Sequence, residues 1–133
     1  MLGFVYSFSK NKSIILGGFM AYVVCWIDTH DAKIFSFNVD KVQKNELHIK
    51  KEDHGEEHFY HRVAEALMPA SEILIVGPGL GKTHFMHHLD SHKVHSALKI
   101  KIKGVENMDH PTDGQIIGYG RKFFKHLDVF EAI

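Results

Sequence analysis

The sequence predicts a three-layer α/β fold, in which helices cover both faces of a mixed β-sheet. Residues 22–28 and 73–76 are short, continuously apolar runs, which are typical of strands buried on both faces. A turn with two glycines and a proline, residues 77–79, ends the second run and leads into a helical pattern. Residues 33–38 and 46–50 alternate apolar and polar side chains, as half-buried strands do.

The first half of the chain is expected to form three strands and a helix. The strands at 22–28, 33–38 and 46–50 follow each other through short turns, so they make an antiparallel meander. A polar loop over residues 50–57 then leads into a helix that ends before Pro69. The apolar face of this helix is expected to consist of Phe59, Val63, Ala66 and Leu67.

The second half alternates strands with helices. The strand at 73–76 precedes a helix over residues 82–91, and the alternation of Ile100 and Ile102 with lysines favours a last strand at 97–105. The final helix begins at Thr112 and Asp113, which suit a helix N-terminus. Its apolar face is expected to consist of Ile116, Gly120, Phe123 and Leu127.

This order, βββαβαβα, is that of ribonuclease H-like folds, in which parallel strands extend a three-strand meander. The strand at 22–28 then lies in the middle of the sheet. We expect residues 20–133 to form one such domain. Residues 1–19 are expected to be an N-terminal extension, either disordered or a start-site artefact, because Met20 stands just before the first convincing strand.

The composition restricts the partners and the compartment. The 133 residues include 16 basic and 16 acidic side chains, so no global field attracts the chain to nucleic acid or a membrane. The apolar run at 14–27 is too short to span a bilayer. Cys25 lies inside an apolar run and is expected to be a buried thiol of a protein in a reducing cytoplasm. The oligomeric state is not predicted.

The glycine turn does not match a nucleotide-binding loop. Such a loop follows the pattern G-x-x-x-x-G-K-[ST], whose backbone N–H groups surround the phosphates. Gly81 and Lys82 fit its end, but Val76 stands where its first glycine belongs, and Pro78 has no N–H to donate. We therefore expect a tight strand-to-helix connection.

Two motifs resemble the middle domain of the archaeo-eukaryotic release factor and Pelota group, and especially its small single-domain bacterial relatives, which are described as translational machinery proteins. The motif residues are Gly77, Pro78, Gly79 and Lys82 in the first segment and Asp109, His110, Pro111, Thr112, Asp113 and Gly114 in the second. By element order the resemblance covers residues 22–127. It implies a ribonuclease H-like fold and a role in translation.

The resemblance does not extend to the catalytic tripeptide of release factors. Those proteins carry Gly-Gly-Gln in the loop before the first helix, whereas the loop at 50–57 holds one glycine, Gly55, and no glutamine. Gln115 lies at a later helix start instead. The resemblance thus implies a ribosome- or RNA-binding module without peptidyl-tRNA hydrolase activity. It favours a binding protein over an enzyme.

Two sets of basic residues are candidates for contact with RNA or the ribosome, together forming one patch. The first set lies on one side of the expected last strand, and the second lies on the final helix. They are Lys99, Lys101 and Lys103, and Arg121, Lys122 and Lys125. Lysines on a strand also discourage edge-to-edge pairing, so that explanation remains open.

The chain contains twelve histidines, which raises the possibility of a metal site. His84 and His88 have the i, i+4 spacing that places two imidazoles on one ion, so they are candidate zinc ligands, with His95 on the same flank. His58 and His61 belong to a second group, with His54, on the first helix. Solvated helix surface is the alternative for both groups.

Two enzyme hypotheses compete with the binding module. A metal-dependent hydrolase would use the histidines. A two-metal nuclease would need clustered carboxylates such as Asp28 and Glu65, and it is disfavoured because the strand at 73–76 ends without an acid. A small-molecule enzyme would use residues 109–114, because ligands of α/β sheets often bind where a strand ends and a helix begins. The same residues also fit a helix entry capped by Thr112 or Asp113.

Overall fold

The computed structural model describes residues 22–38 and 41–126. Its elements, in chain order, are strands β1 (Tyr22–Ile27), β2 (Asp31–Phe37) and β3 (Val42–His48), helix α1 (Glu56–Leu67), strand β4 (Glu72–Gly77), helix α2 (Gly79–Ser91), the 3-10 helix η3 (Lys93–Lys101), strand β5 (Ile102–Asn107) and helix α3 (Asp113–His126). None of these helices has the length and hydropathy needed to cross a bilayer. The N-terminal extension expected at 1–19 lies outside the described residues.

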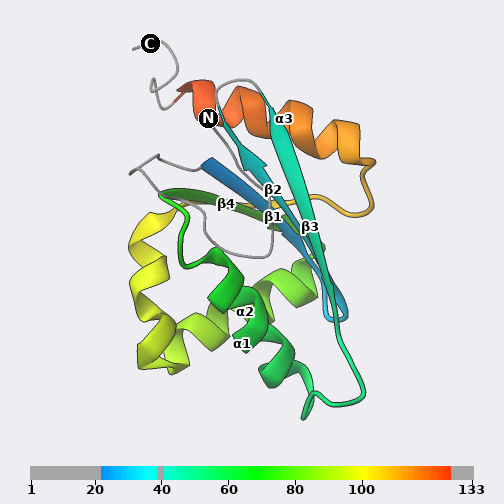
Figure 1. Ribbon diagram of the computed structural model, residues 1–133, viewed down its shortest axis with the longest axis vertical. Coiled ribbons are helices and arrows are strands. Elements are labelled where there is room, and N and C mark those ends of the chain that lie inside the picture. The colour runs from blue at the N-terminus through cyan, green and yellow to red at the C-terminus, as the bar shows by residue number, and fades with distance from the viewer. Residues whose placement is uncertain (1–21, 39–40, 127–133) are drawn as a thin grey trace.

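The five strands form one mixed sheet in the order β3-β2-β1-β4-β5. β2 pairs antiparallel with β1 and β3, whereas β4 pairs parallel with β1 and β5. Helix α3 covers one face of the sheet, and α1, α2 and η3 cover the other (Figure 1). The expected ribonuclease H-like architecture, with three layers and the order βββαβαβα, is confirmed.

Strand β1 lies in the middle of the sheet, as predicted, and all six of its side chains are buried. Cys25 faces Ile34 of β2 on one side and Ile75 of β4 on the other. Its burial raises the pKa of the Cys25 thiol to about 12, so the thiol stays protonated and unreactive at neutral pH. The continuous apolar run therefore follows from burial on both faces of a central strand.

Alternate residues of β1 belong to two separate cores. Val23, Cys25 and Ile27 face the layer of α1, α2 and η3. Tyr22, Val24 and Trp26 face α3. The first core is completed mainly by Phe59, Val63, Leu67, Ile73, Ile75, Phe85, Leu89 and Leu98, and the second by Phe35, Phe37, Leu74, Val76, Ile116 and Phe124.

Two of the predicted helix faces need correction by single residues. On α1, Ala66 is exposed, and Tyr60 and Ala64 are buried beside Phe59, Val63 and Leu67. On α3, Phe124 is fully buried where Phe123 was expected, because residues 116, 120 and 124 follow each other at intervals of four along the sheet. Leu127 lies outside the described residues.

The predicted strand at 97–105 is wrong in its first half. Residues 93–101 form η3, and β5 begins only at Ile102. Buried His95 and Leu98 lie three residues apart, which is the repeat of a 3-10 helix, whereas Ile100 is 79% exposed. The alternation of isoleucines with lysines thus reflects a strand only from Ile102 onward.

Strand β3 starts four residues before the predicted boundary. It begins at Val42, which pairs with Phe37, and none of its side chains is fully buried. Because β3 is an edge strand held by backbone pairing with β2, it needs few apolar side chains. Its polar sequence therefore predicts a strand only weakly.

A partly buried ion pair fixes the loop between β3 and α1. The Asp53 carboxylate is 3% exposed and accepts hydrogen bonds from Arg62 Nη2 at 2.8 Å, Arg62 Nε at 3.1 Å and the Lys50 N–H at 2.7 Å. Arg62 Nη2 also donates to the carbonyl of His48, at 2.7 Å. These bonds close the loop onto helix α1.

The Asp53 ion pair predicts a pH dependence of stability. The hydrogen bonds from Arg62, aided by the Lys50 N–H, lower the pKa of Asp53 from 3.8 to about 2. Because the folded pKa is the lower one, the stabilisation is complete above pH 3.8 and is lost as the pH falls from there to about 2. We expect Asp53→Asn to lower the Tm at pH 7, with a difference from wild type that shrinks over that acidic interval.

Thermal unfolding of both proteins from pH 7 to pH 2 tests this prediction. Exposed Glu52, the neighbouring residue, provides the matched control, and Glu52→Gln should leave the Tm unchanged at every pH. A Tm difference for Asp53→Asn that stays constant down to pH 2 contradicts the assigned role of the carboxylate.

Candidate functional site

The strand–turn–helix unit at 77–82 is a close-packed connection. Gly77 has φ 146°, and a Cβ there would overlap the carbonyl oxygen of Ile27. A Cβ on Gly81 would overlap the backbone of Asp28. Lys82 is buried, and its N–H donates to the carbonyl of Pro78 at 3.3 Å. The glycines therefore allow α2 to begin against the end of β1, which accounts for them without a bound phosphate.

Residues 109–114 contain a reciprocal helix cap. The Thr112 N–H donates to Gln115 Oε1 at 2.9 Å, and the Gln115 N–H donates to Thr112 Oγ1 at 3.1 Å. This is the capping-box arrangement, with glutamine in the third helical position. Just upstream, Trp26 Nε1 donates to the carbonyl of Met108 at 2.9 Å, so the segment is fastened to the central strand.

Asp113 fastens the same helix to the edge of the sheet. Its carboxylate lies 2.6 Å from Lys44 Nζ of β3 and 3.7 Å from Lys33 Nζ of β2. The hydrogen bond from Lys44 lowers the pKa of Asp113. Thr112, Asp113 and Gln115 are thus engaged in holding α3, and only part of the segment remains for a ligand.

The remaining residues of this segment line a wide, open hollow beside α3. Its lining consists of Met108, Asp109, His110, Pro111, Gln115, Gly118, Tyr119 and Lys122. The His110 ring lies 6.1 Å from the Trp26 ring, centroid to centroid. Of the six basic candidates, Lys122 is the one that lines this hollow.

The predicted basic patch is divided between different parts of the molecule. Lys99 and Lys101 lie on η3 and Lys103 on β5, so the expected single strand face is wrong. Lys99 pairs with Asp90 at 2.5 Å, Lys101 donates to the carbonyl of Met68 at 2.7 Å, and Lys103 lies 3.9 Å from Glu72. The other set, Arg121, Lys122 and Lys125, is exposed on α3, on the opposite face of the sheet.

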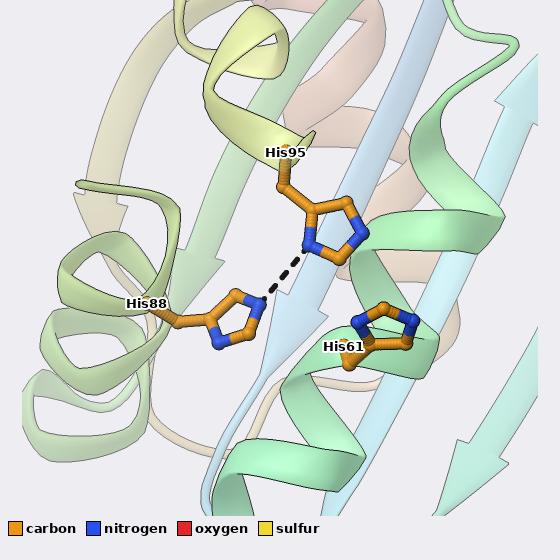
Figure 2. A group of neighbouring side chains, drawn as sticks. All are labelled: His61, His88 and His95. Atoms are coloured by element: carbon orange, nitrogen blue, oxygen red, sulfur yellow. Dashed lines mark hydrogen bonds between the residues drawn. The ribbon is translucent and has the colours of Figure 1, made fainter. Parts of the chain in front are cut away.

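The histidines group differently from the prediction. His88 is 1% exposed and faces His95, which is fully buried, at 3.2 Å between Nε2 and Nδ1. Exposed His61 of α1 joins them, and ring nitrogens of the three lie within 4.8 Å of one another (Figure 2). His84 points elsewhere, since its Nδ1 lies 3.2 Å from Glu56 Oε1. The structure thus brings His88 to His95 of η3 rather than to His84, which faces Glu56.

Two glutamates of α1 complete the histidine cluster. Glu57 Oε1 lies 2.8 Å from His88 Nδ1, and Glu65 Oε2 lies 2.9 Å from His95 Nε2. Burial lowers the pKa of His88, and the hydrogen bond to Glu57 opposes this effect. The result is a continuous chain of polar contacts, Glu57–His88–His95–Glu65, between the three elements that cover one face of the sheet.

A second possible metal group shares His88. Glu57, His88 and His92 offer ligand atoms within 4.8 Å of one another. The His92 ring stacks on that of His88, with centroids 4.1 Å apart, and its Nδ1 lies 2.9 Å from the carbonyl of His88.

Sequence reasoning missed the roles of His61, Glu57 and Glu65 in this cluster. The spacing of His88, His92 and His95 along one flank of α2 and η3 was the available signal. The contribution of α1 depends on how α1 and α2 pack, which spacing along the chain does not give.

The fold is that of a domain of larger proteins. The chain resembles Archaeoglobus fulgidus Pelota, with 19% identity and a TM-score of 0.57 over 77% of this chain and 31% of that one. It resembles Thermoplasma acidophilum Pelota at 18% identity and 0.55, over 71% and 30%. It also resembles the archaeal translation termination factor aRF1 at 13% identity and 0.51, over 81% and 41%.

The structural similarity to Pelota and aRF1 extends over most of this chain, at low sequence identity. The chain itself spans only about a third of the Pelota proteins and less than half of aRF1. No family model and no curated protein matches the sequence. The comparisons thus establish the fold predicted from the two motifs.

Proposed function

We propose that this chain acts in translation as a ribosome- or RNA-binding module without peptidyl-tRNA hydrolase activity. The observation that carries the proposal is the shared fold with Pelota and with aRF1, which is named as a translation termination factor. The two motifs at 77–82 and 109–114 support it, because both lie where the fold requires them, at the starts of α2 and α3.

The loop before α1 supports the absence of hydrolase activity. The corresponding loop of release factors carries Gly-Gly-Gln, whereas this loop has Gly55 and no glutamine. Asp53 closes it onto Arg62 of α1 instead. In a peptidyl-tRNA hydrolysis assay with purified ribosomes, we expect no release above the rate without protein.

Helix α3 is the better candidate for an RNA-contacting surface. Among the described residues, no carboxylate lies within ion-pair distance of Arg121, Lys122 or Lys125, whereas Lys99 and Lys103 both have acidic partners. Within the described ranges, no nearby carboxylate offsets the positive potential of these exposed side chains, which favours their contact with phosphate groups.

The proposal predicts salt-dependent co-sedimentation with ribosomes. If α3 contacts three phosphates, Arg121→Ala/Lys122→Ala/Lys125→Ala should weaken binding and reduce the slope of log K against log[salt] by about 3. The matched control is Lys50→Ala/Lys51→Ala/Lys93→Ala. It also removes three positive charges, but from η3 and the loop before α1 on the opposite face of the sheet, and it should leave the slope unchanged. Absence of the wild-type protein from every ribosomal fraction at low salt contradicts the proposal, and equal effects of the two variants contradict the role of α3.

Three observations weigh against a site built on Asp28 and Glu65 and against a small-molecule site at the start of α3. Asp28 Oδ1 accepts the N–H groups of His30 at 2.9 Å and Asp31 at 2.7 Å, so this carboxylate closes the β1–β2 turn. Glu65 faces His95 on the α1 side of the sheet. At the start of α3, the cap and the ion pairs of Asp113 occupy the polar groups that a small-molecule site would use.

A further inference from the structure

We infer that His61, His88 and His95 form a binding site for a zinc-class divalent transition metal ion, with Glu57 and Glu65 as the outer acceptors that orient its ligands. The three histidines come from α1, α2 and η3, and their rings converge between these helices (Figure 2). The site is separate from the α3 surface proposed for RNA, since α3 lies on the opposite face of the sheet.

Two buried ring nitrogens of the cluster face each other, since His88 Nε2 and His95 Nδ1 lie 3.2 Å apart. The second nitrogen of each ring faces a carboxylate: Glu57 Oε1 lies 2.8 Å from His88 Nδ1, and Glu65 Oε2 lies 2.9 Å from His95 Nε2. A carboxylate that accepts a hydrogen bond from one nitrogen of an imidazole leaves the lone pair of the other nitrogen available to a metal ion.

The two facing rings are shielded from water, because His88 and His95 are 1% and 0% exposed. A transition metal ion gains directed bonds to the neutral rings in place of its hydration shell, and imidazole nitrogens are common ligands for zinc.

The distance between the two buried ring nitrogens fits one tetrahedral ion. Zn–N bonds of about 2.0–2.1 Å at the tetrahedral angle hold two ligand nitrogens about 3.3 Å apart, and His88 Nε2 and His95 Nδ1 lie 3.2 Å apart. Metal-bound histidines usually donate their second N–H to a carboxylate, which is how Glu57 contacts His88 and Glu65 contacts His95. His61, about half exposed, supplies the third nitrogen at the outer side of the site.

The test compares two histidines of similar exposure on neighbouring helices. His61 and His84 have 47% and 43% exposed side chains, so neither replacement should disturb folding. Full-length, tag-free protein is stripped with a chelator, and zinc affinity is measured at pH 7.5 by competition with a chromophoric chelator. We expect one tight site in the wild type, a loss of roughly 100-fold or more in His61→Gln, a loss of about 10–100-fold in Glu65→Gln, and no change in His84→Gln.

Two further readouts complement those affinities. Zinc should raise the Tm of the wild type and of His84→Gln but not that of His61→Gln. Cobalt bound to the stripped protein should show the strong visible absorption of a tetrahedral site. Equal affinities of His61→Gln and His84→Gln overturn the inference, and a loss in His92→Gln with none in His61→Gln overturns it in favour of the Glu57–His88–His92 group. The absence of zinc binding would not change the result expected for co-sedimentation with ribosomes.

Discussion

Replacing Gly81 by alanine is expected to destabilise the protein by about 3 kcal/mol, because an added methyl group has no space there. A Cβ on this residue would overlap the Cα and carbonyl carbon of Asp28 and the nitrogen of Thr29. All three are backbone atoms, so no side chain can rotate away to relieve the overlap. Either α2 or the β1–β2 turn must move, and both are packed against the sheet.

Gly79 provides the matched control, since it lies two residues earlier on the same helix. A Cβ there would meet no atom within 4 Å. Alanine loses less backbone entropy than glycine on folding, so Gly79→Ala should be neutral or should stabilise by about 0.5 kcal/mol. Urea unfolding of the two variants measures both free energies. Equal effects of the two substitutions contradict the close approach of α2 to β1.

Phe124→Ala is expected to cost about 3–5 kcal/mol, as is usual for removing a buried phenyl ring. Phe124 is fully buried and is the main contribution of α3 to the second core. Its ring stacks on that of Tyr22 with centroids 5.2 Å apart and meets the edge of Phe37 at 6.0 Å. The cavity left by its removal would lie between α3 and the centre of the sheet, where neither side can close it easily.

The adjacent Phe123 gives a control of identical chemistry. Its ring is only partly buried and packs over Gly104 of β5 at the margin of the same core. Phe123→Ala should therefore cost clearly less than Phe124→Ala in the same unfolding experiment. A larger cost for Phe123→Ala than for Phe124→Ala would support the helix face expected from the sequence and contradict the orientation of α3 in the structure.

The architecture was predictable because its central strands carry a strong local signal. The apolar runs in β1 and β4 arise from burial on both faces. β2 also contributes to both cores, with Ala32 and Ile34 on one side and Phe35 and Phe37 on the other. Polar β3 and helix η3 gave weaker signals. η3 buries His95 and Leu98 with a repeat of three, and the alternation of Lys99, Ile100 and Lys101 after them imitates a strand.

The histidine cluster was only partly predictable, for a geometric reason. Sequence spacing relates residues on one helix, such as His88 and His84, whereas the structure joins His88 to His61 and Glu57 of α1. Such contacts depend on the orientation of α1 against α2, which the packing of Tyr60 and Phe85 determines, with ring centroids 5.9 Å apart. The same argument explains why six basic residues predicted as one patch lie on η3, β5 and α3.

The alternation of β1 between two cores has a consequence for folding errors. Moving this strand by one position along its neighbours would send Val23 and Cys25 toward α3 and Val24 and Trp26 toward α1 and α2. Both cores would be mispacked at once. A misfolded state with a shifted β1 therefore keeps neither core intact and is not stabilised by either. β3 is polar and contributes no fully buried side chain, so a shift in its pairing with β2 removes no fully buried side chain from either core. We therefore expect shifted strand pairings to occur first between β3 and β2.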